Sequence, residues 1–200
     1  MNKPALLLFD LGGVLIENAT CERLNCLLPQ PLDDAIVKER WLHSSAIRRF
    51  ERGDISPQDF AESFIAEWEI RLTVDAFLQE FISWPKGFYP EARETLRVLR
   101  QSYRVCCLSN SNVLHWERFG GFTEDFDIAL SSHLLGVIKP DQEAFTRALR
   151  EFDIGPEEVC FFDDILTNIQ AAQSIGMRAF HVEGFKALQC VLQEQDLLSV

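Results

Sequence analysis

The sequence predicts a doubly wound α/β domain built on a parallel sheet, with a smaller helical unit inserted after the first strand. Five short apolar segments are mostly continuous rather than alternating, which is typical of strands covered on both faces. They span residues 5–9, 104–108, 128–130, 159–162 and 178–182. Helical patterns separate the later segments, whereas residues 18–86 contain helical patterns and no convincing strand. This alternation of strand and helix favours the doubly wound class.

The first strand, predicted over residues 5–9, ends in Asp10 with Gly12 and Gly13 close behind. A carboxylate at the carboxyl end of a parallel strand lies at the edge of the sheet where open α/β folds bind ligands. The two glycines allow a sharp turn that brings the backbone close to such a ligand. The same residues also suit an ordinary turn at the end of a strand, so both interpretations stay open at this point.

The helical unit is predicted over residues 18–86. Phe60, Phe64 and Trp68 recur every four residues, which places them on one face of a helix that Ser56 is expected to cap. We interpret these aromatic side chains as the core of the unit rather than as a cofactor site. Some side chains of the unit must nevertheless face a ligand, and an arginine there would suit a second anionic group; the candidates are Trp41, His43, Arg48, Arg49 and Phe50.

Two further polar segments follow predicted strands. Ser109 and Asn110 directly follow the strand predicted over residues 104–108, ahead of a helix predicted to begin near Val113. A hydroxyl and free backbone amides at that position favour an anion, although a plain N-cap has the same residues. Lys139 precedes another predicted helix. Its ammonium is a point charge suited to a phosphate or a carboxylate, although a single lysine is also typical of a solvated surface.

Two adjacent carboxylates, Asp163 and Asp164, follow the strand at residues 159–162, with Asn168 one helical turn further on. Two such groups are costly to hold together unless a cation neutralises them. Oxygen ligands of this kind suit Mg²⁺, which keeps several waters and takes one or two carboxylates. The pair therefore predicts a magnesium site.

Composition excludes several classes of protein. The chain has 200 residues, is 47% hydrophobic and carries a formal net charge of −12. Disorder is not expected, no apolar run is long enough to cross a membrane, and the acidic balance disfavours nucleic acid. Six cysteines without a C-x-x-C pair indicate reduced thiols and hence the cytoplasm: Cys21, Cys26, Cys106, Cys107, Cys160 and Cys190.

The order of these four polar segments along the chain resembles that of the haloacid dehalogenase-like hydrolase superfamily. Asp10 matches its first motif, Ser109 its second, Lys139 its third, and Asp164 with Asn168 its fourth. The resemblance covers essentially the whole chain. It implies a Rossmann-like core made of residues 1–17 and 87–200, and a helical cap made of residues 18–86 that lies between motifs one and two.

The resemblance also implies roles for the residues. Asp10 would attack phosphorus to form an aspartyl-phosphate that water hydrolyses. Mg²⁺ would be held by Asp10, Asp164 and the backbone carbonyl of Gly12. Lys139 would neutralise charge in the transition state. Ser109, Asn110 and Lys139 would bind the phosphoryl group. Asp163 and Asn168 would not contact the substrate but would orient Asp164, the lysine network, or both.

Gly12 departs from the family pattern, because phosphatases of this superfamily usually have a second aspartate there as general acid and base. One reading is a phosphatase that prefers acyl or anomeric phosphates, or in which Glu17 or a cap residue supplies the proton. A second is carbon–halogen or carbon–phosphorus hydrolysis. A third is a non-catalytic protein that binds a phospho-ligand or a partner. We favour the first: a Mg²⁺-dependent phosphatase of a small phosphorylated metabolite, monomeric or homodimeric, with neither nucleic acid nor membrane as partner.

Overall fold

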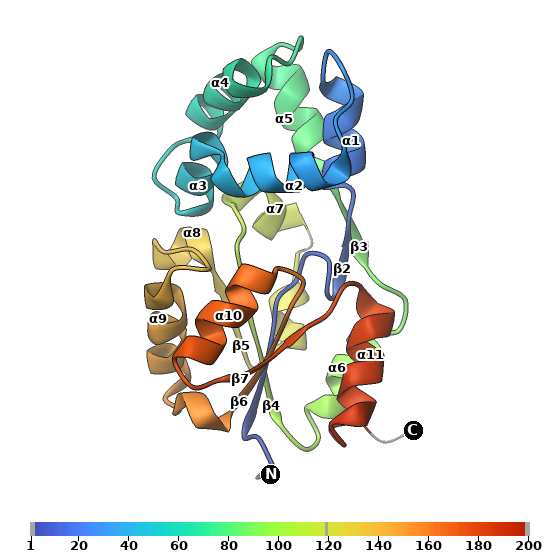
Figure 1. Ribbon diagram of the computed structural model, residues 1–200, viewed down its shortest axis with the longest axis vertical. Coiled ribbons are helices and arrows are strands. Elements are labelled where there is room, and N and C mark those ends of the chain that lie inside the picture. Colours follow the sequence, from blue (N-terminus) through green and yellow to red (C-terminus); the bar gives the residue numbers. More distant parts are fainter. Residues whose placement is uncertain (1–2, 119, 199–200) are drawn as a thin grey trace.

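The computed structural model describes residues 3–118 and 120–198, in which five parallel strands form the central sheet in the order β5-β4-β1-β6-β7 (Figure 1). The register joins Leu8 of β1 to Cys106 of β4 on one side and to Phe161 of β6 on the other. The doubly wound class is therefore confirmed, and each predicted strand is present. The strands are β1 (Leu6–Phe9), β4 (Arg104–Ser109), β5 (Ile128–Ser131), β6 (Val159–Asp163) and β7 (Arg178–His181).

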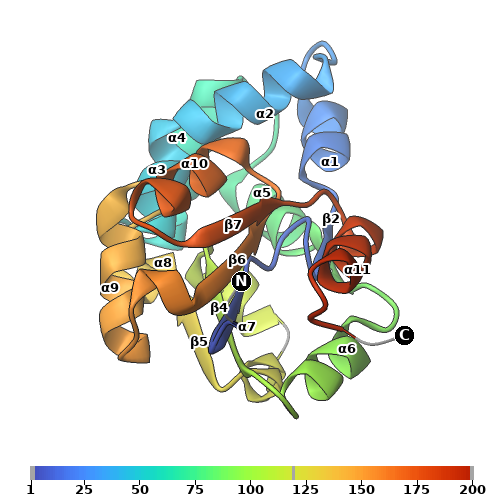
Figure 2. The ribbon, with the colours of Figure 1, turned by 60° about the horizontal axis from the view of Figure 1, so that its bottom comes forward.

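Helices cover both faces of this sheet (Figure 2). Leu7 and Phe9 point into a core with α6 (Ala92–Leu99) and α11 (Phe185–Glu194). Leu6 and Leu8 point into the opposite core, which α9 (Gln142–Phe152) and α10 (Leu166–Ser174) complete. Since successive residues of a strand face opposite sides, both sets must be apolar, and this accounts for the continuous apolar runs of the sequence.

A row of stacked aromatic rings crosses three neighbouring strands of the sheet. The ring centroids of Phe9 and Phe162 lie 5.1 Å apart, and those of Phe162 and Phe180 lie 5.5 Å apart, both pairs in stacked geometry. Phe9 directly precedes Asp10, and Phe162 directly precedes Asp163. The row therefore packs immediately behind the two carboxylates.

Short elements complete the part of the chain around the sheet. They are α7 (Val113–Arg118), η1 (Phe122–Asp125), α8 (Ser132–Leu135) and η2 (Pro156–Glu158). The α7 helix lies against the inserted helices, where the His115 ring stacks on Phe81 and its Nε2 lies 2.9 Å from the Phe81 carbonyl oxygen. Burial lowers the pKa of His115 to about 4, so this contact is made by a neutral imidazole.

Five helices inserted after the first strand form the cap: α1 (Thr20–Leu27), α2 (Asp34–His43), α3 (Ser45–Glu51), α4 (Pro57–Trp68) and α5 (Val74–Ile82). Their core is aromatic, as the spacing of Phe60, Phe64 and Trp68 predicts, and all three side chains are buried. Ser56 caps α4 by accepting a hydrogen bond from the Asp59 backbone N–H. The cap therefore has a hydrophobic core distinct from the two cores of the sheet.

The expectation that residues 18–86 contain no strand is wrong at their ends. β2 (Ile16–Asn18) and β3 (Pro85–Phe88) pair antiparallel where the chain enters and leaves the cap. Strands this short show no periodicity, and Pro85 and Gly87 are residues that strands usually avoid. The boundaries at residues 17/18 and 86/87 remain an interpretation, since they fall within this pair of strands.

Two other expectations concern membrane-spanning segments and the state of the cysteines. No helix of residues 3–118 and 120–198 is both long enough and apolar enough to cross a membrane. The six cysteines are free thiols. Cys106, Cys107 and Cys160 are buried in β4 and β6, as predicted, and burial raises their pKa values above that of an ordinary thiol.

Candidate active site

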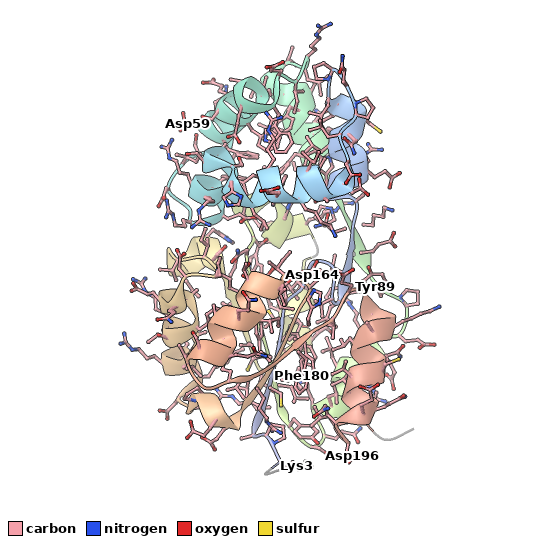
Figure 3. All side chains as sticks on the ribbon, in the orientation of Figure 1. Lys3, Asp59, Tyr89, Asp164, Phe180 and Asp196 are labelled. Atoms are coloured by element: carbon pink, nitrogen blue, oxygen red, sulfur yellow. The ribbon has the colours of Figure 1, made fainter. Side chains whose placement is uncertain are left out.

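The carboxyl ends of three adjacent strands bring the predicted site residues together. Asp10 follows β1, Ser109 ends β4, and Asp163 ends β6 with Asp164 next to it. Because β1 lies between β4 and β6, these side chains meet at one edge of the sheet. Figure 3 shows Asp164 and Tyr89 at the end of the sheet that faces the cap, whereas Lys3 and Asp196 lie at the opposite end.

Lys139 joins two of the carboxylates. Its Nζ lies 2.7 Å from Asp10 Oδ1 and 2.6 Å from Asp163 Oδ2, and its side chain is 1% exposed. Burial alone would lower the pKa of Lys139, but the two carboxylates outweigh burial and raise the pKa above its ordinary value. The lysine is therefore a permanently charged ammonium held against Asp10.

Asp163 and Asn168 hold this lysine in place. The Asn168 side-chain amide lies 3.0 Å from both carboxylate oxygens of Asp163, and the Ile165 backbone N–H donates to Asp163 Oδ1 at 2.8 Å. Asp163 is fully buried. Of the two roles left open by the sequence, Asn168 thus contacts the lysine network rather than Asp164.

The Lys139 backbone is fixed by Asn110. The side-chain amide of Asn110 accepts a hydrogen bond from the Lys139 backbone N–H at 2.9 Å and donates one to the Lys139 carbonyl oxygen at 2.9 Å. This reciprocal pair occupies the Asn110 side chain and ties the end of β4 to the lysine loop. Ser109 beside it is 4% exposed and lines a cavity at this edge of the sheet. Sequence reasoning did not find this structural use of Asn110, because it depends on a contact across 29 positions.

Asp10 and Asp164 both have pKa values raised above that of an ordinary aspartate. Burial raises the pKa of Asp10 to about 6 against the opposing effect of Lys139. Burial, together with Asp10 and Asp163, raises the pKa of Asp164 to about 8. Lys139 binds one oxygen of Asp10. Among the described residues, the Asp164 carboxylate accepts a hydrogen bond only from its own backbone N–H, and the Gly12 carbonyl accepts none.

These oxygens fit a divalent cation. No cluster of three or more His, Cys, Asp or Glu suited to a metal ion is found among residues 3–118 and 120–198. A site made of two carboxylates, one carbonyl and water is nevertheless the kind that Mg²⁺ accepts, because this ion retains several waters. A cation there would also offset the burial and the neighbouring negative charges that raise both pKa values.

A cavity of about 840 Å³ lies between this edge and the cap. Asp10, Ser109, Lys139 and Asp164 line it from the sheet side, with Gly12, Asn110 and Asn168. From the cap, three of the five candidates line it, namely Trp41, His43 and Arg48. Arg49 does not, and Phe50 is buried in the cap core.

Besides Asp10 and Asp164, four acidic residues line this cavity, and no sequence pattern marks them as site residues: Glu22, Asp34, Glu51 and Glu183. Glu51 ends α3, lines the cavity and is partly buried. Burial and the negative charge of Asp10 raise the pKa of Glu51 to about 8, although Lys139 and Arg48 oppose this shift. No motif marks Glu51, because its position depends on how α3 packs on the sheet part.

The fold and the cavity define a capped α/β protein, in which a helical insert covers the carboxyl edge of a doubly wound sheet. The family model of haloacid dehalogenase-like hydrolases matches residues 4–176. The chain belongs to this family, and it is a hydrolase.

Known relatives are similar over most of the chain. A D-ribitol-5-phosphate phosphatase of Bacteroides thetaiotaomicron is 26% identical, with 88% of this chain and 91% of that protein covered. A sesquiterpene phosphatase of Aspergillus oryzae is 32% identical, with 88% of each chain covered. A haloacid dehalogenase family enzyme of B. thetaiotaomicron, solved with magnesium and inorganic phosphate, superposes with a TM-score of 0.72 at 25% identity, covering 90% of this chain and 94% of that one.

Proposed function

We propose that the protein is a Mg²⁺-dependent phosphatase that hydrolyses a small phosphorylated metabolite through an aspartyl-phosphate on Asp10. The observation that carries the proposal is the buried Lys139, which holds Asp10 at the cavity by one carboxylate oxygen. An oriented, ionised carboxylate beside a fixed cation is what nucleophilic attack on a phosphoryl group requires. The relatives named as phosphatases support this choice.

The residues at this edge of the sheet have distinct roles in the proposed reaction. Asp10 attacks phosphorus, and the bond to the leaving oxygen breaks. The Lys139 ammonium and the Ser109 hydroxyl stabilise the charge that develops on the phosphoryl oxygens. Asn110 contributes its backbone N–H to the same oxygens, because its side chain is occupied by Lys139. Water then attacks the same phosphorus, which releases phosphate and regenerates the Asp10 carboxylate.

Magnesium would be held by Asp10, Asp164 and the Gly12 carbonyl. When bound, it would supply a positive charge to the phosphoryl oxygens and lower the repulsion between the two aspartates. Asp163 and Asn168 keep Lys139 in position rather than binding the ion. The cap, as the other wall of the cavity, is proposed to select the group that leaves.

A screen of phosphorylated metabolites with and without Mg²⁺ tests the proposal. Alkyl, sugar and acyl phosphates should include substrates whose hydrolysis stops when the metal is chelated. Asp10→Asn should abolish turnover and binding of beryllium fluoride, which mimics the phosphoryl group on a carboxylate. Activity that survives chelation or Asp10→Asn would contradict the mechanism, and the absence of both activity and beryllium fluoride binding would favour a non-catalytic protein.

A further inference from the structure

The end of helix α3 is fixed against the sheet part of the molecule. A Cβ built on Gly53 would lie 2.7 Å from the His133 carbonyl oxygen, so only glycine allows this approach. Arg48 Nη2 lies 3.6 Å from Asp141 Oδ1, just beyond the lysine loop. Glu51 lies between these two contacts along the chain. Its position at the cavity is therefore set by contacts on both sides, rather than by a free helix end.

The Glu51 carboxyl has no polar partner among the described residues. No residue of 3–118 and 120–198 donates a hydrogen bond to it or forms an ion pair with it. The charged groups that act on it are Asp10, Lys139 and Arg48. The Glu51 oxygens are not among the buried atoms that lack a partner, so this carboxyl is open to the cavity, where a group with a strongly shifted pKa is a candidate for a functional role.

The alternative named from the sequence, Glu17, is placed elsewhere. Its carboxylate binds Lys86 Nζ at 2.9 Å, its side chain is 48% exposed, and it does not line the cavity. Glu22 does line the cavity, but its side chain is 72% exposed and lies 3.7 Å from the same lysine. Glu51 is the cap carboxyl that combines burial with a position near Asp10.

We propose that Glu51 supplies the acid and base group that Gly12 lacks. The inference rests on the proposed phosphatase function. As the bond between phosphorus and the leaving oxygen breaks, the Glu51 carboxyl gives its proton to that oxygen, and a neutral alcohol departs. Glu51 is left as a carboxylate, and the phosphoryl group is bonded to Asp10.

The second half of the reaction restores both groups. Glu51 takes a proton from the water that attacks phosphorus, the bond from Asp10 to phosphorus breaks, and hydrogen phosphate leaves. In-line displacement places both the departing oxygen and the incoming water opposite Asp10. The cap forms the cavity wall on that side, so one cap residue serves both steps. The raised pKa of Glu51 keeps it protonated near neutral pH, as the first step requires.

The role of Glu51 is tested by measuring the turnover of substrates with different leaving groups by the Glu51→Gln variant. The variant should lose about 10²- to 10⁴-fold in kcat/KM on alkyl phosphates, the usual contribution of a general acid, and less than about tenfold on acetyl phosphate. The loss should follow the basicity of the leaving oxygen. The falling limb of the wild-type pH profile for alkyl phosphates should be absent from the variant. Glu62→Gln, a hydrogen-bonded and exposed glutamate of α4, is the matched control and should change neither substrate.

A double variant separates chemistry from structure. Gly12→Asp, added to Glu51→Gln, should restore part of the alkyl phosphate activity by placing a carboxyl at the usual family position. Equal losses on alkyl and acetyl phosphate, or no loss, would overturn the assignment of Glu51 while wild-type turnover upheld the phosphatase. A wild-type protein inactive on every ester and unable to bind beryllium fluoride would overturn both.

Discussion

Replacing Gly13 by alanine should displace Asp164 and weaken metal binding. Gly13 has a φ of +76°, and a Cβ there would lie 2.3 Å from Asp164 Oδ2. Ordinary contacts begin at 3.4 Å, so the carboxylate must retreat by 3.4 − 2.3 = 1.1 Å. The backbone conformation adds about 1–2 kcal/mol for a residue with a side chain. A displacement of about 1 Å in a reacting assembly is enough to lower turnover about 100-fold.

Thermal unfolding and a Mg²⁺ titration measure these effects. In a domain of this size the backbone cost corresponds to a decrease in Tm of about 2–8 °C. The Mg²⁺ concentration for half-maximal activity should rise together with the loss of turnover. Gly12→Ala is the comparison, because its built Cβ lies 3.5 Å from Asn18 Nδ2 and its φ lies outside the left-handed region. If both variants had the same Tm and the same Mg²⁺ titration, the inferred contact between Gly13 and Asp164 would be refuted.

Three further predictions follow from the charged groups. Lys139→Met should destabilise the protein by about 3–5 kcal/mol in urea unfolding, because Asp10 and Asp163 lose their buried partner; an unchanged midpoint would contradict this. Folding raises the pKa of Glu51 from 4.5 to about 8, so its contribution to stability is complete below pH 4.5 and is lost as the pH rises to 8. Glu51→Gln should therefore be more stable than wild type by about 2 kcal/mol at pH 8.5 and should show no such advantage at pH 4. This difference is smaller than the full change in pKa implies, because the carboxyl is partly exposed to solvent. Gly12→Asp alone should raise turnover of alkyl phosphates more than that of acetyl phosphate, and equal gains on both would argue against proton donation.

Much of the sheet could be predicted from the sequence because of its local pattern. The runs at β1, β4 and β6 are apolar on both faces, and a polar residue ends or directly follows each of them at the same edge. The pattern fails where an element is too short to show a period, as in β2 and β3. Those strands pair with each other over a long separation in the chain, and nothing local specifies that pairing.

The predicted site depends in the same way on local and distant contacts. Asp10 and Asp164 are recognisable because each follows a strand, and their convergence follows from the sheet order alone. Glu51 is different, since its place at the cavity arises from the approach of α3 to α8 and from the Arg48–Asp141 ion pair. Contacts between the cap and the sheet part have no period in the sequence, and this is why a cap residue could be expected without being identified.

The row of stacked rings formed by Phe9, Phe162 and Phe180 separates two kinds of evolutionary change. It anchors the backbone directly behind Asp10 and Asp163, in a core that is separate from the core of the cap helices. Substitutions in the cap can therefore alter which molecules enter the cavity, while the packing behind the reacting carboxylates stays unchanged. New specificities are accessible to such a scaffold without reinventing its chemistry.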